Sequence, residues 1–328
     1  MRTFIAYFDS GTTNSRLFLL DENLSVIGMT KKMVGARDSA ISGSNRLLVS
    51  SLYEMYQGIL TQKGISDNEV SDIFLSGMIT SVYGIKEIPH ILLPVDSRTL
   101  AEGVATVNED MFFKRDVHLI CGVKTTGKEI SDVGNMRGEE TELVGLTDEL
   151  KPRGLDDVAV ILPGSHTHIA YVSGGSIVDC ISNFTGELLF ALHKDTIFAP
   201  ILEKQPEKFN EEMVALALKN LDSYGFNRAI YIAHAMKMTN VMDMERIRSY
   251  AYAVINGGLR KVLENACRTK WTRCRTAVVL GGIKDGELFS ILFKGSEEIK
   301  SIIHMESVDG SFALDGFRNI YKDWKVGK

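Results

Sequence analysis

The chain has 328 residues, 45% of them hydrophobic and 24% charged, and a formal net charge of -5. This composition is typical of a soluble globular protein, and the length favours two domains over one. The acidic balance argues against a nucleic-acid partner. No apolar run approaches the ~20 residues that cross a bilayer, so we expect no membrane contact.

We see no signal peptide at the N-terminus, which favours a cytoplasmic protein. The spacing of the cysteines fits neither a disulfide framework nor a zinc site, so we expect reduced thiols. They are Cys121, Cys180, Cys267 and Cys274. The sequence leaves a homo-oligomer open.

The chain opens with a strand pattern built around a polar turn. Apolar residues 4–8 and 15–20 predict two strands, and the turn 9–14 between them reads Asp-Ser-Gly-Thr-Thr-Asn. Residues 24–29 predict a third strand. A turn rich in Gly, Ser and Thr offers backbone N–H and hydroxyl donors to an anion. A plain hairpin turn would have a similar composition.

Helices and buried strands then alternate as far as residue 150, which indicates an α/β domain. The apolar spacing predicts a helix at 45–63, a strand at 73–78, a loop with a helix within 95–107, a strand at 117–123 and a helix at 137–150. Residues 151–154, Lys-Pro-Arg-Gly, are the expected hinge. We expect one lobe at 1–150 and a second at 151–328.

The opening pattern returns in the second half. Predicted strands at 158–162, 168–172 and 176–181 surround a turn at 163–167, Pro-Gly-Ser-His-Thr. The remaining predicted elements are helices at 185–192, 208–223 and 246–268, the last interrupted at 256–258, strands at 277–280 and 299–305, and a helix at 311–324. Residues 194–210 have no readable pattern, and we interpret them as a mobile active-site loop.

Two α/β halves, each opening on a meander with a phosphate turn, resemble the actin, hexokinase and heat-shock chaperone ATPase superfamily. The D-x-G-T motif at 9–12 and the strand ending in Gly-Gly at 278–282 match that superfamily. The resemblance implies a two-lobed fold, each lobe a ribonuclease-H-like mixed sheet with flanking helices. It also implies a nucleotide in the cleft between the lobes.

Longer motifs resemble one family, the 2-keto-3-deoxygalactonate kinases, over the whole chain. They are Asp-x-Gly-Thr-Thr-Asn-x-Arg at 9–16, Met-Arg-Gly-Glu-Glu-Thr-Glu-Leu at 136–143, Leu-Pro-Gly-Ser-His at 162–166 and Thr-Gly-Glu-Leu at 185–188. The resemblance implies a kinase that uses ATP and Mg²⁺ to phosphorylate the terminal hydroxyl of 2-dehydro-3-deoxy-galactonate.

The chain departs from the family pattern at Ser10, at 79–84 and at His234. A kinase of the same fold acting on another sugar acid or polyol is therefore one alternative. A nucleotide or sugar-acid sensor without catalysis is a second. An actin-like filament ATPase is a third, but nothing in the sequence reads as a filament insertion.

Phosphoryl transfer needs charge neutralisation at the phosphates, a metal, and a base on the attacking hydroxyl. We assign Asp9 to Mg²⁺, through water because Mg²⁺ keeps several of its waters; the alternative is an Asp that forms a turn with its own backbone. The phosphate-binding candidates of the first turn are Gly11, Thr12, Thr13 and Asn14. Arg16 is a candidate for holding a phosphate or the substrate carboxylate, or it is a surface arginine.

The resemblance places a catalytic acid at the start of the helix predicted at 137–150. Glu139 is the first choice because it follows Gly138, and Glu140 is the second. Such a carboxylate would take the hydroxyl proton, although two acids in a first turn also complement the helix dipole. Arg137 is a candidate clamp for an acidic substrate.

The second half supplies the remaining candidates. Gly164, Ser165 and His166 would form a second phosphate turn, and Gly281 and Gly282 would let adenosine lie against bare backbone. Thr185 and Glu187 reach the substrate or merely cap a helix. His166 and His168 could form a metal pair, but alternating strand positions explain them better.

Overall fold

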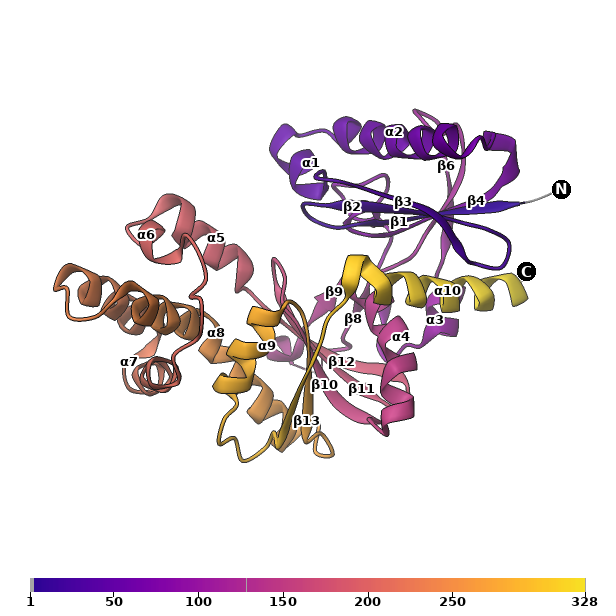
Figure 1. The fold of residues 1–328 in the computed structure, drawn as a ribbon. Coiled ribbons are helices and arrows are strands. Elements are labelled where there is room, and N and C mark those ends of the chain that lie inside the picture. Colours follow the sequence, from indigo (N-terminus) through magenta and orange to yellow (C-terminus); the bar gives the residue numbers. More distant parts are fainter. Residues whose placement is uncertain (1–2, 128, 328) are drawn as a thin grey trace. The chain divides into compact units, whose positions relative to one another are not determined.

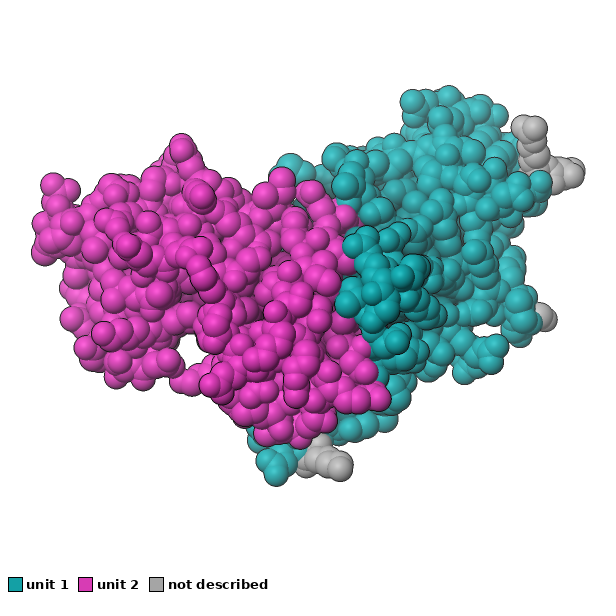
Figure 2. Space-filling model, turned by 60° about the horizontal axis from the view of Figure 1, so that its bottom comes forward, with its two compact units in different colours: residues 1–156, 173–180, 308–328 teal, residues 157–172, 181–307 magenta. Residues whose placement is uncertain are grey.

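A computed structural model describes residues 3–127 and 129–327, which form two compact units (Figures 1 and 2). Unit 1 comprises Met1–Asp156, Ser173–Cys180 and Val308–Lys328, and unit 2 comprises Asp157–Val172 and Ile181–Ser307. The chain therefore leaves unit 1 twice, at residues 156 and 180, and returns to it at residues 173 and 308. By its contacts the C-terminal segment, which begins at Val308, belongs to unit 1, and the lobe bounds 1–150 and 151–328 stay a prediction.

Unit 1 is built on a six-stranded sheet with the order β3-β2-β1-β4-β7-β6. The first three strands form an antiparallel meander, and β4 and β7 continue it in parallel with β1. The strands are β1 (Phe4–Ser10), β2 (Ser15–Leu20), β3 (Val26–Lys32), β4 (Val70–Gly77), β6 (Ala105–Glu109) and β7 (Arg115–Leu119). A smaller sheet contains β5 (Ile91–Leu92), β8 (Val123–Lys124) and β9 (Asn135–Met136).

Helices cover both faces of the large sheet: α2 lies on one side and α10 on the other (Figure 1). The core beneath α10 is aromatic, with the rings of Tyr7 and Phe317 stacked at 4.2 Å between centroids. The helices of unit 1 are α1 (Ala36–Ser42), α2 (Arg46–Lys63), α3 (Ser97–Glu102), α4 (Glu139–Leu150) and α10 (Ser311–Val326).

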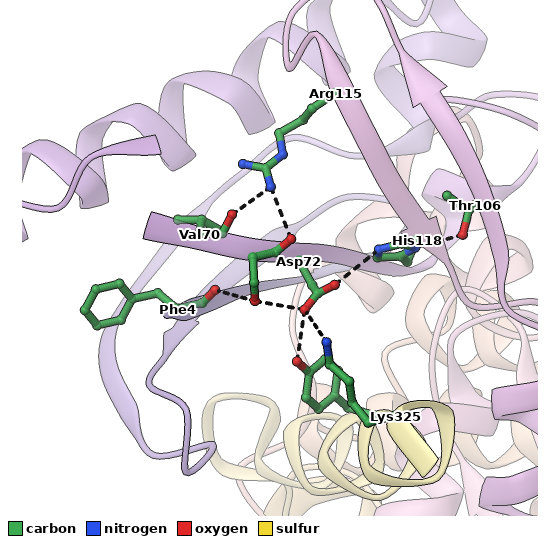
Figure 3. Close-up of polar contacts among 9 residues, drawn as sticks. Phe4, Val70, Asp72, Thr106, Arg115, His118 and Lys325 are labelled. Carbon is green, nitrogen blue, oxygen red and sulfur yellow. Dashed lines mark hydrogen bonds and ion pairs between the residues drawn. The ribbon is translucent and has the colours of Figure 1, made fainter. Parts of the chain in front are cut away.

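A buried charge anchors the far end of α10 (Figure 3). Asp72 on β4 accepts hydrogen bonds at 3.0 Å from both the Tyr321 hydroxyl and the Lys325 ammonium group, and at 2.8 Å from Ser71. His118 Nε2 lies 3.5 Å from the other carboxylate oxygen. The carboxylate therefore has polar partners on two strands and on α10, as a buried charge requires.

Unit 2 is built on most of a five-stranded sheet, whose strand order is β12-β11-β10-β13-β14. Strand β13 runs parallel to both β10 and β14. The strands are β10 (Asp157–Leu162), β11 (Thr167–Ser173), β12 (Ser176–Asn183), β13 (Thr276–Leu280) and β14 (Ser301–Met305), and residues 176–180 of β12 are grouped with unit 1. The helices are α5 (Gly186–Asp195), α6 (Ala199–Leu202), α7 (Glu211–Met238), α8 (Met244–Thr269) and α9 (Ile283–Leu292).

The predicted α/β class and both strand meanders are confirmed, while two local predictions are wrong. Helix α8 runs unbroken through residues 256–258, because Gly257 packs so closely on α7 that a Cβ there would lie 2.6 Å from Leu221. Strand β7 ends at Leu119, and Val123 pairs in the smaller sheet instead. The predicted helix at 208–223 corresponds to the first part of α7, which kinks at Gly225; the second part of α7, which ends at Met238, was not predicted.

The segment 194–210 also differs from its interpretation as a mobile loop. It contains α6, and it contributes side chains to the core of unit 2, where burial of apolar surface holds it. The buried residues are Phe198, Ile201, Leu202 and Phe209.

All four cysteines are buried free thiols. Among the described residues, no helix has both the length and the apolar character required to cross a bilayer.

Candidate functional site

The first polar turn is held from behind by the start of α1. The N–H groups of Ala36 and Arg37 donate to the carbonyl oxygens of Gly11 and Thr12, at 3.2 and 2.9 Å. Gly35 makes this approach possible, since a Cβ there would lie 2.4 Å from the Thr12 oxygen. With these two carbonyl oxygens satisfied by α1, the tip at Thr13 and Asn14 is exposed and carries a hydroxyl and an amide.

Asp9 forms an ion pair with Arg16, its cross-strand partner in the β1–β2 register. Arg16 Nη1 lies 2.8 Å from Asp9 Oδ2, and the side chains are 35% and 21% exposed. Burial raises the pKa of Asp9, the Arg16 guanidinium opposes that rise, and the charge of Glu139 adds to it. The predicted metal ligand is thus a partly buried carboxylate with one oxygen held by an arginine.

The start of α4 lies against the end of β4. A Cβ on Gly138 would be 3.2 Å from the Cα of Gly77, and Gly77 is the register partner of Ser10 on β1. The parallel pairing of β1 with β4 therefore brings the acidic helix start to the same sheet edge as Asp9. The effect of Glu139 on the pKa of Asp9 reflects this closeness.

The two candidate acids have different environments. The Glu140 side chain is fully buried, and both of its oxygens accept hydrogen bonds from the Gly138 N–H, at 2.9 and 2.7 Å. Burial, with the charge of Glu139, raises the pKa of Glu140 to about 8. Glu139 is only partly buried, and one of its oxygens accepts from the Arg137 N–H at 3.2 Å.

Arg137, the predicted substrate clamp, has a buried guanidinium that contacts protein groups. It donates to the Thr80 carbonyl and hydroxyl oxygens at 2.8 and 2.6 Å and to the Ile88 carbonyl at 2.8 Å, and it also contacts the His90 ring. These bonds hold the segment that contains 79–84, where the sequence departs from the family pattern. Sequence reasoning missed these partners, because no spacing rule links residue 137 to residues 80–90.

The second turn has the same construction as the first. The Glu187 N–H at the start of α5 donates to the Ser165 carbonyl at 2.8 Å, and a Cβ on Gly186 would lie 2.0 Å from the Gly164 oxygen. Gly164 and the side chain of His166 are exposed. Thr185 is buried, and its hydroxyl bonds to that of Thr167 at 2.5 Å. In both units a helix start with a closely packed glycine donates to the turn: to two carbonyls in the first turn and to the Ser165 carbonyl in the second.

The glycine pair after β13 lies beside the second turn, because β10 and β13 are parallel neighbours. A Cβ on Gly281 would be 3.3 Å from the Pro163 ring. Two residues that sequence reasoning missed support the pair: Asp285 accepts from the Gly282 N–H at 3.0 Å, and His304 Nε2 bonds to the Gly281 carbonyl at 2.8 Å. An Asp three residues after a helix-capping glycine is a signal that could have indicated the first of these contacts.

The described residues contain no group of three or more His, Cys, Asp and Glu side chains placed to hold a metal. The rings of His166 and His168 are 6.2 Å apart, and His168 Nδ1 bonds to the Ser182 hydroxyl at 3.1 Å. The structure thus brings the predicted residues together in two groups, one in each unit. The first contains Asp9, Gly11, Thr12, Thr13, Asn14, Arg16, Arg137, Glu139 and Glu140; the second contains Gly164, Ser165, His166, Thr185, Glu187, Gly281 and Gly282.

Comparison with protein families supplies the decisive observation. The family model described as 2-keto-3-deoxy-galactonokinase matches residues 9–284, from the candidate metal ligand to just beyond the Gly-Gly pair. The chain belongs to the 2-keto-3-deoxy-galactonokinase family. This confirms the resemblance on which the sequence analysis relied.

Curated relatives carry the same enzyme name. The protein named "Probable 2-dehydro-3-deoxygalactonokinase DgoK1" of Rhizobium meliloti (strain 1021) is 26% identical over 196 residues, 60% of this chain and 58% of that relative. The 2-dehydro-3-deoxygalactonokinase of Escherichia coli (strain K12) is 22% identical over 189 residues, 58% of this chain and 60% of that relative. The chain thus matches less than two thirds of the length of these relatives.

Solved structures share the fold of this 2-keto-3-deoxy-galactonokinase family member. A Sinorhizobium meliloti crystal structure whose description carries the 2-dehydro-3-deoxygalactonokinase name has a TM-score of 0.75 at 18% identity, covering 98% of this chain and 99% of that chain. The (R)-2-hydroxyglutaryl-CoA dehydratase component A of Acidaminococcus fermentans has a TM-score of 0.50 at 13% identity, covering 99% and 100%. The predicted fold class is therefore confirmed over nearly the whole chain.

Proposed function

We propose that this chain is an ATP-dependent kinase that phosphorylates the terminal hydroxyl of 2-dehydro-3-deoxy-galactonate. The observation that carries the proposal is the family match over residues 9–284, which spans every predicted site residue, from Asp9 to Gly282. The two units would act as the two lobes of the kinase. Their turns, each held by hydrogen bonds from a helix start, would offer backbone N–H and hydroxyl donors to the phosphates of ATP.

Glu139 is the acid best placed to act as the base. Its carboxylate is partly exposed and close enough to Asp9 to influence the pKa of that residue. In the reaction the substrate hydroxyl oxygen bonds to the terminal phosphorus, the bond from that phosphorus to the leaving ADP oxygen breaks, and Glu139 takes the hydroxyl proton. Glu140 instead bonds to its own helix start.

Asp9 suits Mg²⁺ by the chemistry of its donor group. Mg²⁺ usually keeps several waters and binds through one or two carboxylates together with substrate phosphates, so one partly exposed carboxylate at a phosphate turn is sufficient. Bound Mg²⁺ supplies charge neutralisation at the phosphates. The role of Arg16 would be to orient the Asp9 carboxylate through its 2.8 Å bond.

In the second unit, Gly281 and Gly282 would receive adenosine beside the phosphate turn that includes Pro163. Thr185 and Glu187, at the start of α5, would contact the sugar acid. The buried free thiols support a reducing, cytoplasmic compartment.

The test is an ADP-release assay with Mg-ATP and a panel of sugar acids. The panel includes 2-keto-3-deoxygalactonate, its gluconate epimer and simple polyols. Turnover on the galactonate compound alone is the expected result. Turnover on another compound only would support the kinase activity but contradict the proposed substrate. The segment 79–84, which Arg137 holds, would then be the first candidate for the altered specificity. ATP binding without turnover on any compound would contradict the proposal and favour a sensor.

A further inference from the structure

Three charged residues lie in register across the opening meander. Asp9 on β1 pairs with Arg16 on β2, and Arg16 pairs with Lys31 on β3. The turn Val308–Gly310, where the chain re-enters unit 1, lies against this row. Asp309 forms an ion pair with Lys31 at 3.3 Å, and the next residue, Gly310, lies against Arg16.

The contact between Gly310 and Arg16 leaves no room for a side chain. A Cβ on Gly310 would lie 2.5 Å from Arg16 Nη1 and 3.2 Å from Cζ. Nη1 is also the nitrogen that donates to Asp9 Oδ2 at 2.8 Å. One guanidinium nitrogen is therefore confined between the Asp9 carboxylate and the backbone of a buried glycine.

We propose that Gly310 is a positioning residue for the Arg16–Asp9 pair. Because Gly310 has no side chain, the Arg16 guanidinium can lie where its Nη1 donates to Asp9. The consequence for turnover rests on the proposed kinase function, in which Asp9 serves the phosphates. The packing relationship itself does not depend on that function.

The turn itself cannot easily move away from Arg16. Helix α10 follows directly, with Phe312 and Leu314 buried, Phe317 stacked on Tyr7, and its far end bonded to Asp72. The Arg16 guanidinium is the far end of a flexible side chain. A methyl group at position 310 would therefore displace Nη1 from Asp9 rather than displace the backbone.

The experiment compares Gly310→Ala with Gly64→Ala. Both glycines adopt left-handed backbone, with φ +79° and ψ 29° at Gly310 and φ +66° and ψ 32° at Gly64, so an alanine is similarly strained at either position. No described atom lies within 4 Å of the Cβ position at Gly64. Both variants should lower Tm, and Gly310→Ala should lower it further because its methyl group also meets Arg16. Only Gly310→Ala should lower kcat, by roughly ten- to a hundredfold, with KM for ATP and sugar acid nearly unchanged.

A spectroscopic measurement tests the packing without any turnover. The ¹⁵N–¹H signal of the Arg16 guanidinium, assigned by its loss in Arg16→Lys, should shift in Gly310→Ala and stay in place in Gly64→Ala. A shifted signal with undiminished kcat would overturn the catalytic consequence. An unmoved Arg16 signal would overturn the proposal outright. If the wild type phosphorylates no sugar acid, the proposed kinase function is wrong. The Arg16 signal still tests whether Gly310 positions Arg16.

A double variant provides a second check that also needs no activity. With Arg16→Ala, the space that the Gly310→Ala methyl group would enter is vacant. In the Arg16→Ala background, Gly310→Ala and Gly64→Ala should therefore lower Tm by the same amount. A larger Tm change there would mean that Gly310 acts through some other contact, and the proposal would be wrong.

Discussion

Both carboxylate oxygens of Glu140 accept hydrogen bonds from the backbone N–H of Gly138, at 2.9 and 2.7 Å. This fully buried carboxylate closes the N-terminus of α4, where backbone donors otherwise lack partners. Glu139, the preceding residue, is left partly exposed at the edge of the sheet that carries Asp9. Adjacent residues of the same type therefore have separable effects on catalysis and stability.

Replacing the two acids one at a time should separate these effects. Glu139→Gln removes the proposed base and should lower kcat by roughly 10²–10⁴-fold, while ATP binding and Tm stay close to wild type. Glu140→Gln places an amide where two oxygens accept from Gly138, and should lower stability by about 1–3 kcal/mol. Single-turnover kinetics, ATP titration and urea unfolding of each variant check this. A larger loss of kcat in Glu140→Gln than in Glu139→Gln would reverse the assignment.

The buried Glu140 should also make stability depend on pH. Its folded-state pKa is raised from 4.5 to about 8, chiefly by burial, so the folded protein holds a proton that the unfolded chain releases. Its stabilising contribution is complete below pH 4.5 and is lost as the pH rises to about 8. The Tm difference between wild type and Glu140→Gln should therefore shrink over this range. A constant difference from pH 5 to pH 8 would show that Glu140 does not titrate in this way.

The Asp72 cluster predicts the opposite pH dependence (Figure 3). Burial alone would raise the pKa of Asp72, but hydrogen bonds from His118, Lys325 and Ser71 hold it well below its usual value. Its stabilising contribution is present above the unfolded pKa and is lost as the pH falls through the lower folded pKa.

Asp72→Asn should therefore cost about 1–3 kcal/mol of unfolding free energy at pH 7, and less in acid. The exposed Asp110→Asn serves as the control. Urea unfolding at pH 7 and pH 3 measures both variants. Equal effects of Asp72→Asn and Asp110→Asn at pH 7 would contradict the prediction.

Arg137 is expected to act on the 79–90 segment rather than on the phosphates. Arg137→Ala removes the donors that satisfy the Thr80 and Ile88 carbonyls, so amide hydrogen exchange should accelerate within 79–90. KM for the sugar acid should rise more than KM for ATP if this segment contacts the substrate. Arg153→Ala, which removes an exposed ion pair with Glu149, is the matched control. Unchanged exchange in Arg137→Ala would show that the segment is held by other contacts.

Local sequence patterns determined the two meanders, most of the other long strands, most helices and both polar turns, because alternation, apolar runs and turn residues act over a few neighbouring positions. They missed β6 and the two-residue strands β5 and β9. The motif around Asp9 and the Arg-Gly-Glu-Glu run at 137–140 were likewise sufficient to indicate the family. The hinge at 151–154 and the lobe boundaries remain predictions. The structure describes the first part of that hinge as a 3-10 helix, Lys151–Arg153, ended by Gly154.

Tertiary structure decided what depends on residues far apart in the chain. Leu218 and Leu221 of α7 pack against Gly257, so α8 continues where its own sequence favours a break. Core contacts order the segment 194–210, which has no periodic pattern of its own. The parallel pairing of β1 with β4 brings the start of α4 to Asp9. The return of the chain at Val308 places Gly310 against Arg16, a contact between residues too distant in sequence for any local pattern to predict.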